Sequence, residues 1–281
     1  MESIAWVNGV ITSLADARVS FLDRGYLFGD GVYEAMKVVD GRIFALPNHL
    51  DRLERSMEAI RIRPDWARAE LERTIQELVA RSGLSAALIY MQVTRGVAPR
   101  QHAFSPDLTP TLAIFVSDPH PVAPETREKG VKAITVADER WAHPHIKTLN
   151  LLPNVLARQE AAEQGAYEAI FIRDGRLVTE CSSSNVFAVI DDLIVTPPTD
   201  GRILPGVTRD LLLTAAREAN YPVREDYITL EELRGAGEIF ITSTGVEALG
   251  VVDLDGQPVG DGAPGRITGE LYRLFVSRWF V

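Results

Sequence analysis

The sequence predicts an α+β protein of two domains. Segments with the apolar patterns of strands alternate with segments of helical periodicity in both halves of the chain. Asp-Gly pairs between apolar runs predict hairpins, which favour antiparallel or mixed sheets. The 281 residues are long for one core, and residues 118–125 hold three prolines and few apolar side chains. We therefore expect an N-terminal domain at 1–117, a linker at 118–125, a C-terminal domain at 126–281, and a functional site in the crevice between the domains.

The first half of the chain holds strand signals, two helices and a long loop. Asp40-Gly41 lies between apolar runs, which is the pattern of a type I′ hairpin. A helix is expected from about Asn48, because apolar residues recur there at helical spacing. The other expected elements are a helix at 64–82 that ends at Gly83, strands at 86–94 and 111–117, and between these strands a loop, RGVAPRQHAFSPDLTP.

The second half repeats this mixture of strands and helices. A strand is expected at 131–137, and a helix follows with Pro153 in its first turn and Gly165 at its end. Hairpins are expected on Asp174-Gly175, within 185–198 and on Asp255-Gly256. The remaining expected elements are a helix from Thr208, as N-cap, to about Asn220, a strand at 238–243 and a last helix from about Arg266.

Charge and composition exclude several classes of protein. A net charge of −10 and a pI near 5.1 disfavour a nucleic-acid binder with a basic face. No apolar run is long enough for a membrane helix, and the first residues lack the pattern of a signal peptide. A single cysteine, Cys181, allows no internal disulfide, and His143 and His145 lack the neighbours that would complete a metal site. We expect a soluble, cytoplasmic protein without a metal.

Lys147 is the first candidate for chemistry. The chain has only four lysines, so amine chemistry must use Lys37, Lys129, Lys132 or Lys147. Lys147 lies in HPHIKTLNLLPN, where apolar neighbours disfavour the ammonium form and leave an amine for Schiff-base chemistry. The simpler interpretation is a lysine at a strand end whose amine reaches solvent. Lys37 is expected on one strand face with Tyr33, since alternate residues point the same way.

Two segments are suited to a phosphate, and two charged side chains accompany them. Gly206 and Val207 lead into the helix expected at Thr208, whose N-terminus favours an anion, although Thr208 is also a good N-cap. Ser243-Thr244-Gly245 follows a strand and adds hydroxyl and backbone donors. Arg52 lies off its helix's apolar stripe and is either a phosphate ligand or a solvated arginine. Glu180, before three serines, is either part of a polar turn or a partner of a ring nitrogen.

These pieces stand together in one order and resemble a known family. The six motifs are FLDRGYLFGDGVYEAMKV, NHLDRL, IKTLNLLPNVLARQEA, YEAIFIRDGRLVTECSSSNVF, ILPGVTRD and FITSTGVEAL. They are similar to the motif series of the class IV, fold-type-IV pyridoxal-phosphate aminotransferases, from about Phe21 to Leu249. Within that family TRGVAPRQHAF most resembles the D-amino-acid aminotransferases, although Ser105 and Cys181 depart from the familiar pattern.

The resemblance implies a role for each candidate residue. Lys147 matches the lysine that bonds pyridoxal 5′-phosphate and shuttles the substrate proton, and Glu180 matches the carboxylate on the pyridine nitrogen. The phosphate is implied to lie on Arg52, Val207, Thr208 and Thr244. Tyr33 matches a tyrosine beside the substrate. Arg100 and His102 match a pair that binds the substrate carboxylate, and in such enzymes this pair reaches into the partner subunit's site, so a homodimer is implied.

The implied reaction is a ping-pong transfer of the amino group between D-amino acids and 2-oxo acids, with D-alanine and 2-oxoglutarate giving pyruvate and D-glutamate. A branched-chain L-amino-acid aminotransferase of the same fold is the main alternative, followed by aminodeoxychorismate lyase. Two further hypotheses come from other classes. One is a non-catalytic binding protein that kept the fold, and the other is a hydrolase that uses His102 with Ser182, Ser183 or Ser184.

Overall fold

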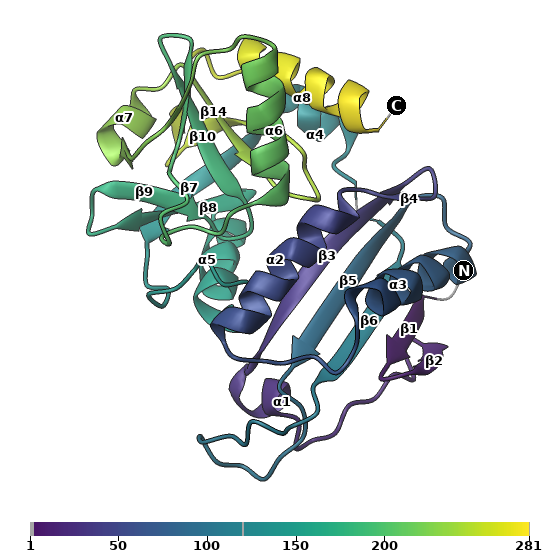
Figure 1. Cartoon of the computed structure of the whole chain (residues 1–281). Coiled ribbons are helices and arrows are strands. Elements are labelled where there is room, and N and C mark those ends of the chain that lie inside the picture. The colour runs from purple at the N-terminus through teal and green to yellow at the C-terminus, as the bar shows by residue number, and fades with distance from the viewer. Residues whose placement is uncertain (1–2, 120, 281) are drawn as a thin grey trace. The chain divides into compact units, whose positions relative to one another are not determined.

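The chain divides into two units, each described here by itself. The computed structural model describes residues 3–119 and 121–280 (Figure 1). The first unit comprises Met1–His120 and Ile146–Asn150, and the second comprises Pro121–His145 and Leu151–Val281. The short segment that contains Lys147 thus belongs to the first unit, whereas the sequence predicted it within a C-terminal domain at 126–281. Within the expected linker, Pro124 begins helix α4 (Pro124–Lys129), because proline is preorganised for the first helical turn.

The first unit is built on one antiparallel sheet. Its strands lie in the order β2-β1-β6-β5-β3-β4 over the described residues. The strand bounds are β1 (Ile4–Val7), β2 (Val10–Ser13), β3 (Gly31–Val39), β4 (Arg42–Ile43), β5 (Ala87–Thr94) and β6 (Thr111–Ser117). The helices are α1 (Arg24–Phe28), α2 (Leu46–Ala59) and α3 (Arg68–Ser82). The hairpin predicted on Asp40-Gly41 is confirmed, since both residues have positive φ between β3 and β4.

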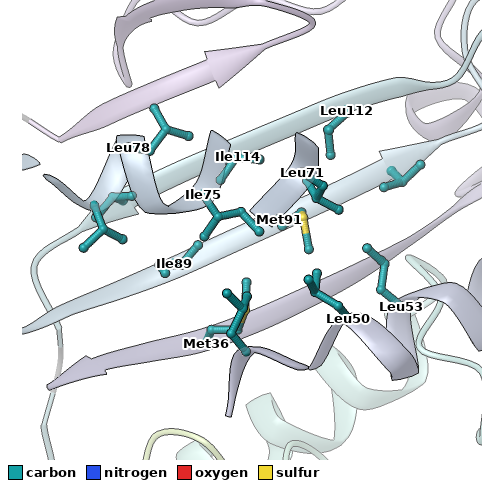
Figure 2. Packing of buried hydrophobic residues seen from close by; sticks show 14 of the residues in the cluster. Met36, Leu50, Leu53, Leu71, Ile75, Leu78, Ile89, Met91, Leu112 and Ile114 are labelled. Atoms are coloured by element: carbon teal, nitrogen blue, oxygen red, sulfur yellow. The ribbon is translucent and has the colours of Figure 1, made fainter. Parts of the chain in front are cut away.

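Helices α2 and α3 cover one face of this sheet (Figure 1). Apolar side chains of the helices, such as Leu50 and Ile75, pack against Met36, Ile89 and Met91 of the strands (Figure 2). Along β3 buried and half-buried residues alternate, as the two-residue period of a strand requires. The half-buried face carries Tyr33, Ala35 and Lys37, so the prediction that Tyr33 and Lys37 share a face is confirmed.

The second unit holds a larger mixed sheet. Its strands lie in the order β12-β11-β10-β14-β15-β7-β8-β9-β13, with β16 paired to β15, and β7 runs parallel to both β8 and β15. The strand bounds are β7 (Val131–Ala137), β8 (Glu168–Arg173), β9 (Leu177–Cys181), β10 (Asn185–Ile190), β11 (Leu193–Thr196), β12 (Val223–Glu225), β13 (Ile228–Thr229), β14 (Glu238–Thr242), β15 (Leu249–Leu254) and β16 (Gln257–Pro258). The helices besides α4 are α5 (Leu152–Glu163), α6 (Val207–Glu218), α7 (Leu230–Arg234) and α8 (Arg266–Trp279).

Three helices begin elsewhere than the sequence predicts. Helix α2 begins at Leu46, two residues before Asn48, because Ala45 takes a left-handed conformation that turns the chain into the helix. Helix α3 begins at Arg68 and not at Pro64, since Ala67 is still extended. Helix α6 begins at Val207 with Gly206 as N-cap, so Thr208 lies inside its first turn. The last shift places the backbone N–H groups of Val207 and Thr208 at the helix N-terminus.

Candidate active site

Lys147 lies beside the start of β3, held there by its backbone. Its carbonyl accepts a hydrogen bond from Tyr33 N at 3.0 Å, and its N–H donates to Ser56 Oγ of α2 at 3.3 Å. Leu149 N donates to the Gly31 carbonyl at 3.0 Å, which continues the pairing with β3. The Lys147 Nζ lies 4.2 Å from the centre of the Tyr33 ring. The amine and the phenol predicted to act together are therefore brought together within the first unit.

A stack of aromatic rings continues from Tyr33 across the sheet. Tyr33 stacks on Tyr90 at 5.7 Å, and Tyr90 stacks on Phe115 at 5.1 Å between ring centres. Burial, with a smaller contribution from Tyr33, raises the pKa of Tyr90 to about 12. The Tyr90 hydroxyl therefore stays protonated and donates to Gln92 Oε1 at 2.9 Å. The stack gives Lys147 a flat aromatic surface.

Arg52 is buried in a salt bridge, so the interpretation as a solvated arginine is wrong. Its Nε and Nη2 donate to the two carboxylate oxygens of Glu34 at 2.7 and 2.8 Å. His49 Nδ1 lies 2.8 Å from Glu34 Oε2 and must carry the hydrogen, because a carboxylate only accepts. Burial lowers the pKa of His49 more than Glu34 raises it, so the imidazole is neutral. Glu34 thus fixes the orientation of the Arg52 guanidinium through a bidentate contact.

A Glu34→Gln variant is expected to lose about 3 kcal/mol of unfolding free energy at pH 7, because the charge of Arg52 stays buried without its partner. Burial raises the pKa of Glu34, but Arg52 outweighs it and lowers the pKa from 4.5 to about 2. A carboxyl group whose pKa is lower in the folded than in the unfolded state stabilises the fold at a pH above its unfolded pKa. This stabilisation is lost as the pH falls through the folded pKa. The difference in unfolding free energy between wild type and variant, measured by urea unfolding, should therefore decrease as the pH falls from 4.5 to about 2. A gap that is constant over that range would contradict the assignment.

The loop at 95–110 is anchored by a second arginine. Arg24 of α1 is 3% exposed and donates to the carbonyls of Gln101 at 2.6 Å and His102 at 3.0 Å, and its Nε donates to Asp30 at 2.7 Å. Phe104 in the same loop lies under the Arg95 guanidinium at 3.6 Å. These contacts fix the loop although Ser105 departs from the familiar pattern.

Arg100 and His102 are exposed, and both lie against the ring of Phe28. The Arg100 guanidinium lies 5.3 Å, and the His102 ring 5.5 Å, from the centre of the Phe28 ring. Both side chains therefore stand over the same aromatic ring, at the surface of the first unit. The two residues predicted to clamp a carboxylate are brought together.

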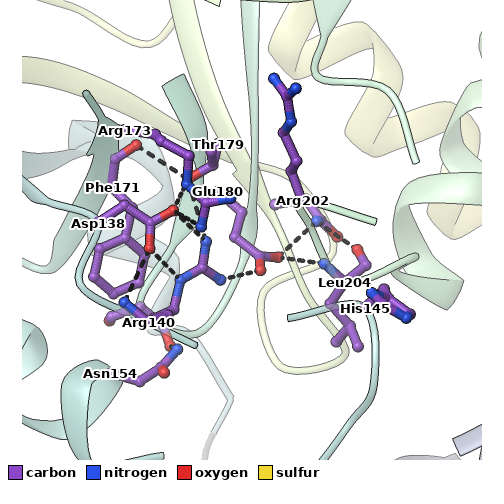
Figure 3. Close-up of polar contacts among 12 residues, drawn as sticks. Asp138, Arg140, His145, Asn154, Phe171, Arg173, Thr179, Glu180, Arg202 and Leu204 are labelled. Atoms are coloured by element: carbon purple, nitrogen blue, oxygen red, sulfur yellow. Dashed lines mark hydrogen bonds and ion pairs between the residues drawn. The ribbon is translucent and has the colours of Figure 1, made fainter. Parts of the chain in front are cut away.

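Glu180 is a buried strand residue whose carboxylate accepts several hydrogen bonds, so it is no part of a polar turn. Its Oε1 accepts from Arg140 Nη1, and its Oε2 accepts from Asn185 Nδ2 at 3.2 Å and from Leu204 N at 3.0 Å (Figure 3). Its side chain is 8% exposed. Arg140 and Asn185 were not predicted from the sequence, where the signal for Asn185 is its place directly after the three serines.

Asn185 joins Glu180 to the N-terminus of α6. Its Nδ2 also donates to the Leu204 carbonyl at 3.0 Å. Its Oδ1 lies so close to Gly206 that a Cβ on residue 206 would be only 2.1 Å from this oxygen. Among the described residues no side chain caps α6 at Gly206. Asn185 thus links Glu180 to the residue that immediately precedes the first N–H groups of this helix of 12 residues. A helix N-terminus of this kind favours an anion.

Thr244 follows strand β14 in a braced turn. Thr242, the last residue of β14, pairs with Asn185, so the turn starts beside the residue that donates to Glu180. Glu247 takes a left-handed conformation with φ +53°, uncommon for such a residue. Arg127 of α4 donates to the Ala248 carbonyl at 2.7 Å and to Glu247 Oε2 at 2.9 Å, which holds the turn in this shape. The sequence analysis did not single out Arg127.

The three serines after Glu180 all donate to one buried carboxylate. Ser183 and Ser184 donate to Glu168 Oε2 at 2.8 and 2.9 Å, and Ser182 donates to Glu168 Oε1. The hydroxyls support the turn between β9 and β10 and do not fit the nucleophile of a hydrolase. Cys181 is packed in the core, where burial raises the pKa of its thiol.

The family model for amino-transferase class IV matches residues 31–254. The chain belongs to the class IV aminotransferases. The match contains Lys147, Glu180 and Thr244, and it covers residues of both units. This class IV aminotransferase has the two-domain α+β fold that the sequence predicts.

Relatives of known name are similar over nearly the whole chain. The D-alanine aminotransferase of Bacillus licheniformis is 42% identical over 93% of this chain and 92% of its own length. That of Staphylococcus aureus (strain MSSA476) is 40% identical over 98% and 97%. Solved structures of branched-chain amino acid aminotransferases share the fold at lower identity. The Escherichia coli enzyme has a TM-score of 0.93 at 25% identity (99% and 95% covered), and that of Thermoproteus uzoniensis has 0.89 at 26% (98% and 94%).

No helix in the described ranges, 3–119 and 121–280, combines the length and apolar character that crossing a bilayer requires.

Proposed function

We propose that this protein is a pyridoxal 5′-phosphate-dependent transaminase that moves the amino group between D-amino acids and 2-oxo acids in a ping-pong reaction. D-Alanine and 2-oxoglutarate, giving pyruvate and D-glutamate, are the proposed pair. The observation that carries the proposal is an identity of 40–42% to D-alanine aminotransferases over more than nine-tenths of the chain. We propose the cytoplasm as its location, because amino acids and 2-oxo acids are intermediates of general metabolism.

The donor set fits this cofactor. Pyridoxal phosphate needs an amine, a carboxylate at its ring nitrogen and an anion site, and the chain offers Lys147, Glu180 and the N-terminus of α6. No side chain of the described residues caps α6 at Gly206, so the N–H groups of its first turn are available to an anion. When bound, the cofactor supplies an electron sink for the carbanion of the substrate.

Each residue then has a definite task. Lys147 Nζ would bond the cofactor and afterwards take the proton from the substrate α-carbon and return it to the cofactor. Glu180 would accept the hydrogen bond from the ring nitrogen and keep that nitrogen protonated. The phosphate would be bound by the N–H groups of Val207 and Thr208, by Thr244 and by Arg52. Tyr33, against Lys147, would orient the substrate beside the amine.

We propose that Arg100 and His102 bind the substrate carboxylate in a partner subunit's site. Each unit exposes large apolar side chains that a second copy would cover, among them Phe21 (72%) and Tyr26 (67%) in the first and Leu152 (67%) in the second. Sedimentation velocity should give a particle of twice 31.0 kDa. A monomer at micromolar concentration would contradict the homodimer.

An Arg24→Met variant is expected to raise the KM for D-alanine and for 2-oxoglutarate about thirtyfold, with a smaller effect on kcat. Arg24 holds the carbonyls of Gln101 and His102, and without it the clamp must be ordered at each binding event, at a cost of about 2 kcal/mol. Steady-state kinetics measure the change. The control is Arg18→Met, because Arg18 is exposed and donates to the nearby carbonyls of Ala15 and Ala17, away from the loop at 95–110. An unchanged KM in a folded Arg24→Met protein would contradict the role of Arg24.

The absorbance spectrum of the purified protein tests the proposed function. A visible band that gives way to a near-ultraviolet band with D-alanine, and not with L-valine, is the expected result. Conversion by L-valine alone would indicate a branched-chain aminotransferase, and pyruvate released without an amino acceptor would indicate an aminodeoxychorismate lyase. No visible band after addition of pyridoxal phosphate would refute the enzyme and leave a binding protein.

A further inference from the structure

Arg140 is a buried guanidinium that links two carboxylates of the second unit. Its Nε and Nη2 donate to the two oxygens of Asp138 at 2.9 and 3.0 Å, and Nη2 also contacts Thr179 Oγ1 at 3.2 Å. Its Nη1 donates to Glu180 Oε1, on the other side of the guanidinium (Figure 3). The ring of Phe171 lies 4.4 Å from its central carbon and covers its face. Arg140 is thus held in one orientation, with one edge on Asp138 and the other on Glu180.

The cluster around Arg140 is balanced in charge, and Arg140 and its two carboxylate partners are buried. Side-chain exposures are 5% for Arg140, 8% for Glu180 and 0% for Asp138. Arg173 Nη2 lies 3.0 Å from Asp138 Oδ2 and is the second cation, so two carboxylates face two guanidinium groups. Burial lowers the pKa of Arg140, but Asp138 and Glu180 outweigh burial and raise this pKa above its ordinary value. Burial raises the pKa of Asp138, but Arg140, Thr179 and Arg173 outweigh burial and lower it. Both groups stay ionised.

Stability alone gives little reason for such a cluster. A buried ion pair loses its hydration, and apolar residues of the same volume often stabilise a fold as well. The N–H donors of Arg140 bond Asp138, Thr179 and Glu180, so they are used for contacts within the second unit. Its position next to Glu180 is the feature that a packing role leaves unexplained.

We propose that Arg140 is a positioning residue that weakens Glu180 as a base, so that the proton shared between Glu180 and the ring nitrogen of the cofactor stays on the nitrogen. The inference rests on the proposed function, and it assigns the property that makes Glu180 suitable. A hydrogen bond to the charged form of a carboxylate stabilises that form. Oε1 of Glu180 receives a charge-assisted bond from Arg140, whereas Oε2 receives two neutral ones from Asn185 and Leu204. Loss of Arg140 would raise the proton affinity of Glu180 and draw the proton away from the ring.

The test is the nitrogen-15 spectrum of holoenzyme loaded with pyridoxal phosphate labelled at the ring nitrogen. The chemical shift of this nitrogen reports directly whether it carries a proton. Wild type is expected at the position of a protonated ring. Arg140→Met is expected to move more than half of the way to the neutral position, as calibrated on free cofactor, and Arg140→Lys, which keeps the charge, is expected to stay near wild type.

Arg173→Met is the matched control. Arg173 also pairs with Asp138, at 3.0 Å from Oδ2, so its replacement by methionine removes the same charge from the cluster while the bond from Arg140 to Glu180 stays. If Arg140→Met does not fold, the double variant Asp138→Asn, Arg140→Met removes one charge of each sign and gives the same reading.

Two results would overturn the inference. One is an Arg140→Met nitrogen that stays protonated as in wild type, which would make Arg140 a structural residue. The other is an equal change in Arg173→Met, which would make net charge and not contact the cause. A wild-type protein that binds no cofactor would instead refute the proposed function, so the two failures are distinguishable.

Discussion

Replacement of Lys147 by alanine is expected to reduce transamination by at least about ten-thousandfold, since the variant loses both the amine that bonds the cofactor and the base at the substrate α-carbon. The backbone of residue 147 bonds Tyr33 N and Ser56 Oγ, and neither contact uses the side chain. The midpoint of urea unfolding should therefore change little. Coupled assay of pyruvate from D-alanine measures the activity.

Lys132→Ala is the control for the loss of a lysine. Its side chain is 63% exposed, with a distant ion pair to Asp253 at 3.9 Å, so full activity is expected. If Lys147→Ala kept a tenth of wild-type turnover, the amine chemistry would have to reside on another of the four lysines. The first to examine would be Lys37, on the same strand face as Tyr33.

The candidate site was predictable where its signal is local. Lys147, Glu180 and Thr208 each lie in a short motif whose turn residues and apolar runs fix the local geometry within about ten residues. The hairpins followed from Asp-Gly pairs for the same reason, since positive φ at both positions is a property of the turn itself. Boundaries set by a single residue, such as Ala45 in a left-handed conformation, left no such signal.

The supporting residues were not predictable, because their partners are distant in the sequence. Arg140 and Glu180 are 40 residues apart, and Glu34 and Arg52 are 18 apart on a strand and a helix. Glu34 did leave a trace. It falls between Val32 and Met36 on the apolar face of β3, and a carboxylate at such a position must have a buried cation as partner. Arg52 is that cation, although its place off the apolar stripe of its helix is also typical of a solvated side chain.

Asn185 shows how the second unit converts such contacts into a site. It pairs with Thr242 at the end of β14, donates to Glu180, and fills the space at Gly206 before α6. Three segments with predicted cofactor contacts therefore meet at one residue, β14 through its backbone and the other two through its side-chain amide. The amide can keep this place only if position 206 has no Cβ.

Gly206→Ala is accordingly expected to weaken pyridoxal phosphate binding by about a hundredfold and to cost about 1–3 kcal/mol of stability. The added Cβ would lie 2.1 Å from Asn185 Oδ1 and 3.2 Å from Arg209 Cβ. The φ of Gly206 is −70°, which alanine adopts without strain, so the effect would be steric. Asn185 cannot withdraw without breaking its bonds to Glu180 and Leu204. Equilibrium titration of the apoprotein with cofactor, followed by absorbance, measures the loss.

Gly235→Ala is the matched control, at the end of α7 in the same unit. Its φ is −89°, and its nearest non-bonded atom to an added Cβ is the Glu231 carbonyl at 3.5 Å, an ordinary contact. We expect no change in cofactor affinity there. A Gly206→Ala protein that binds cofactor as tightly as wild type would show that Asn185 can move away from position 206. In that case its bonds to Glu180 and Leu204 would not be what holds the start of α6 in place for the phosphate.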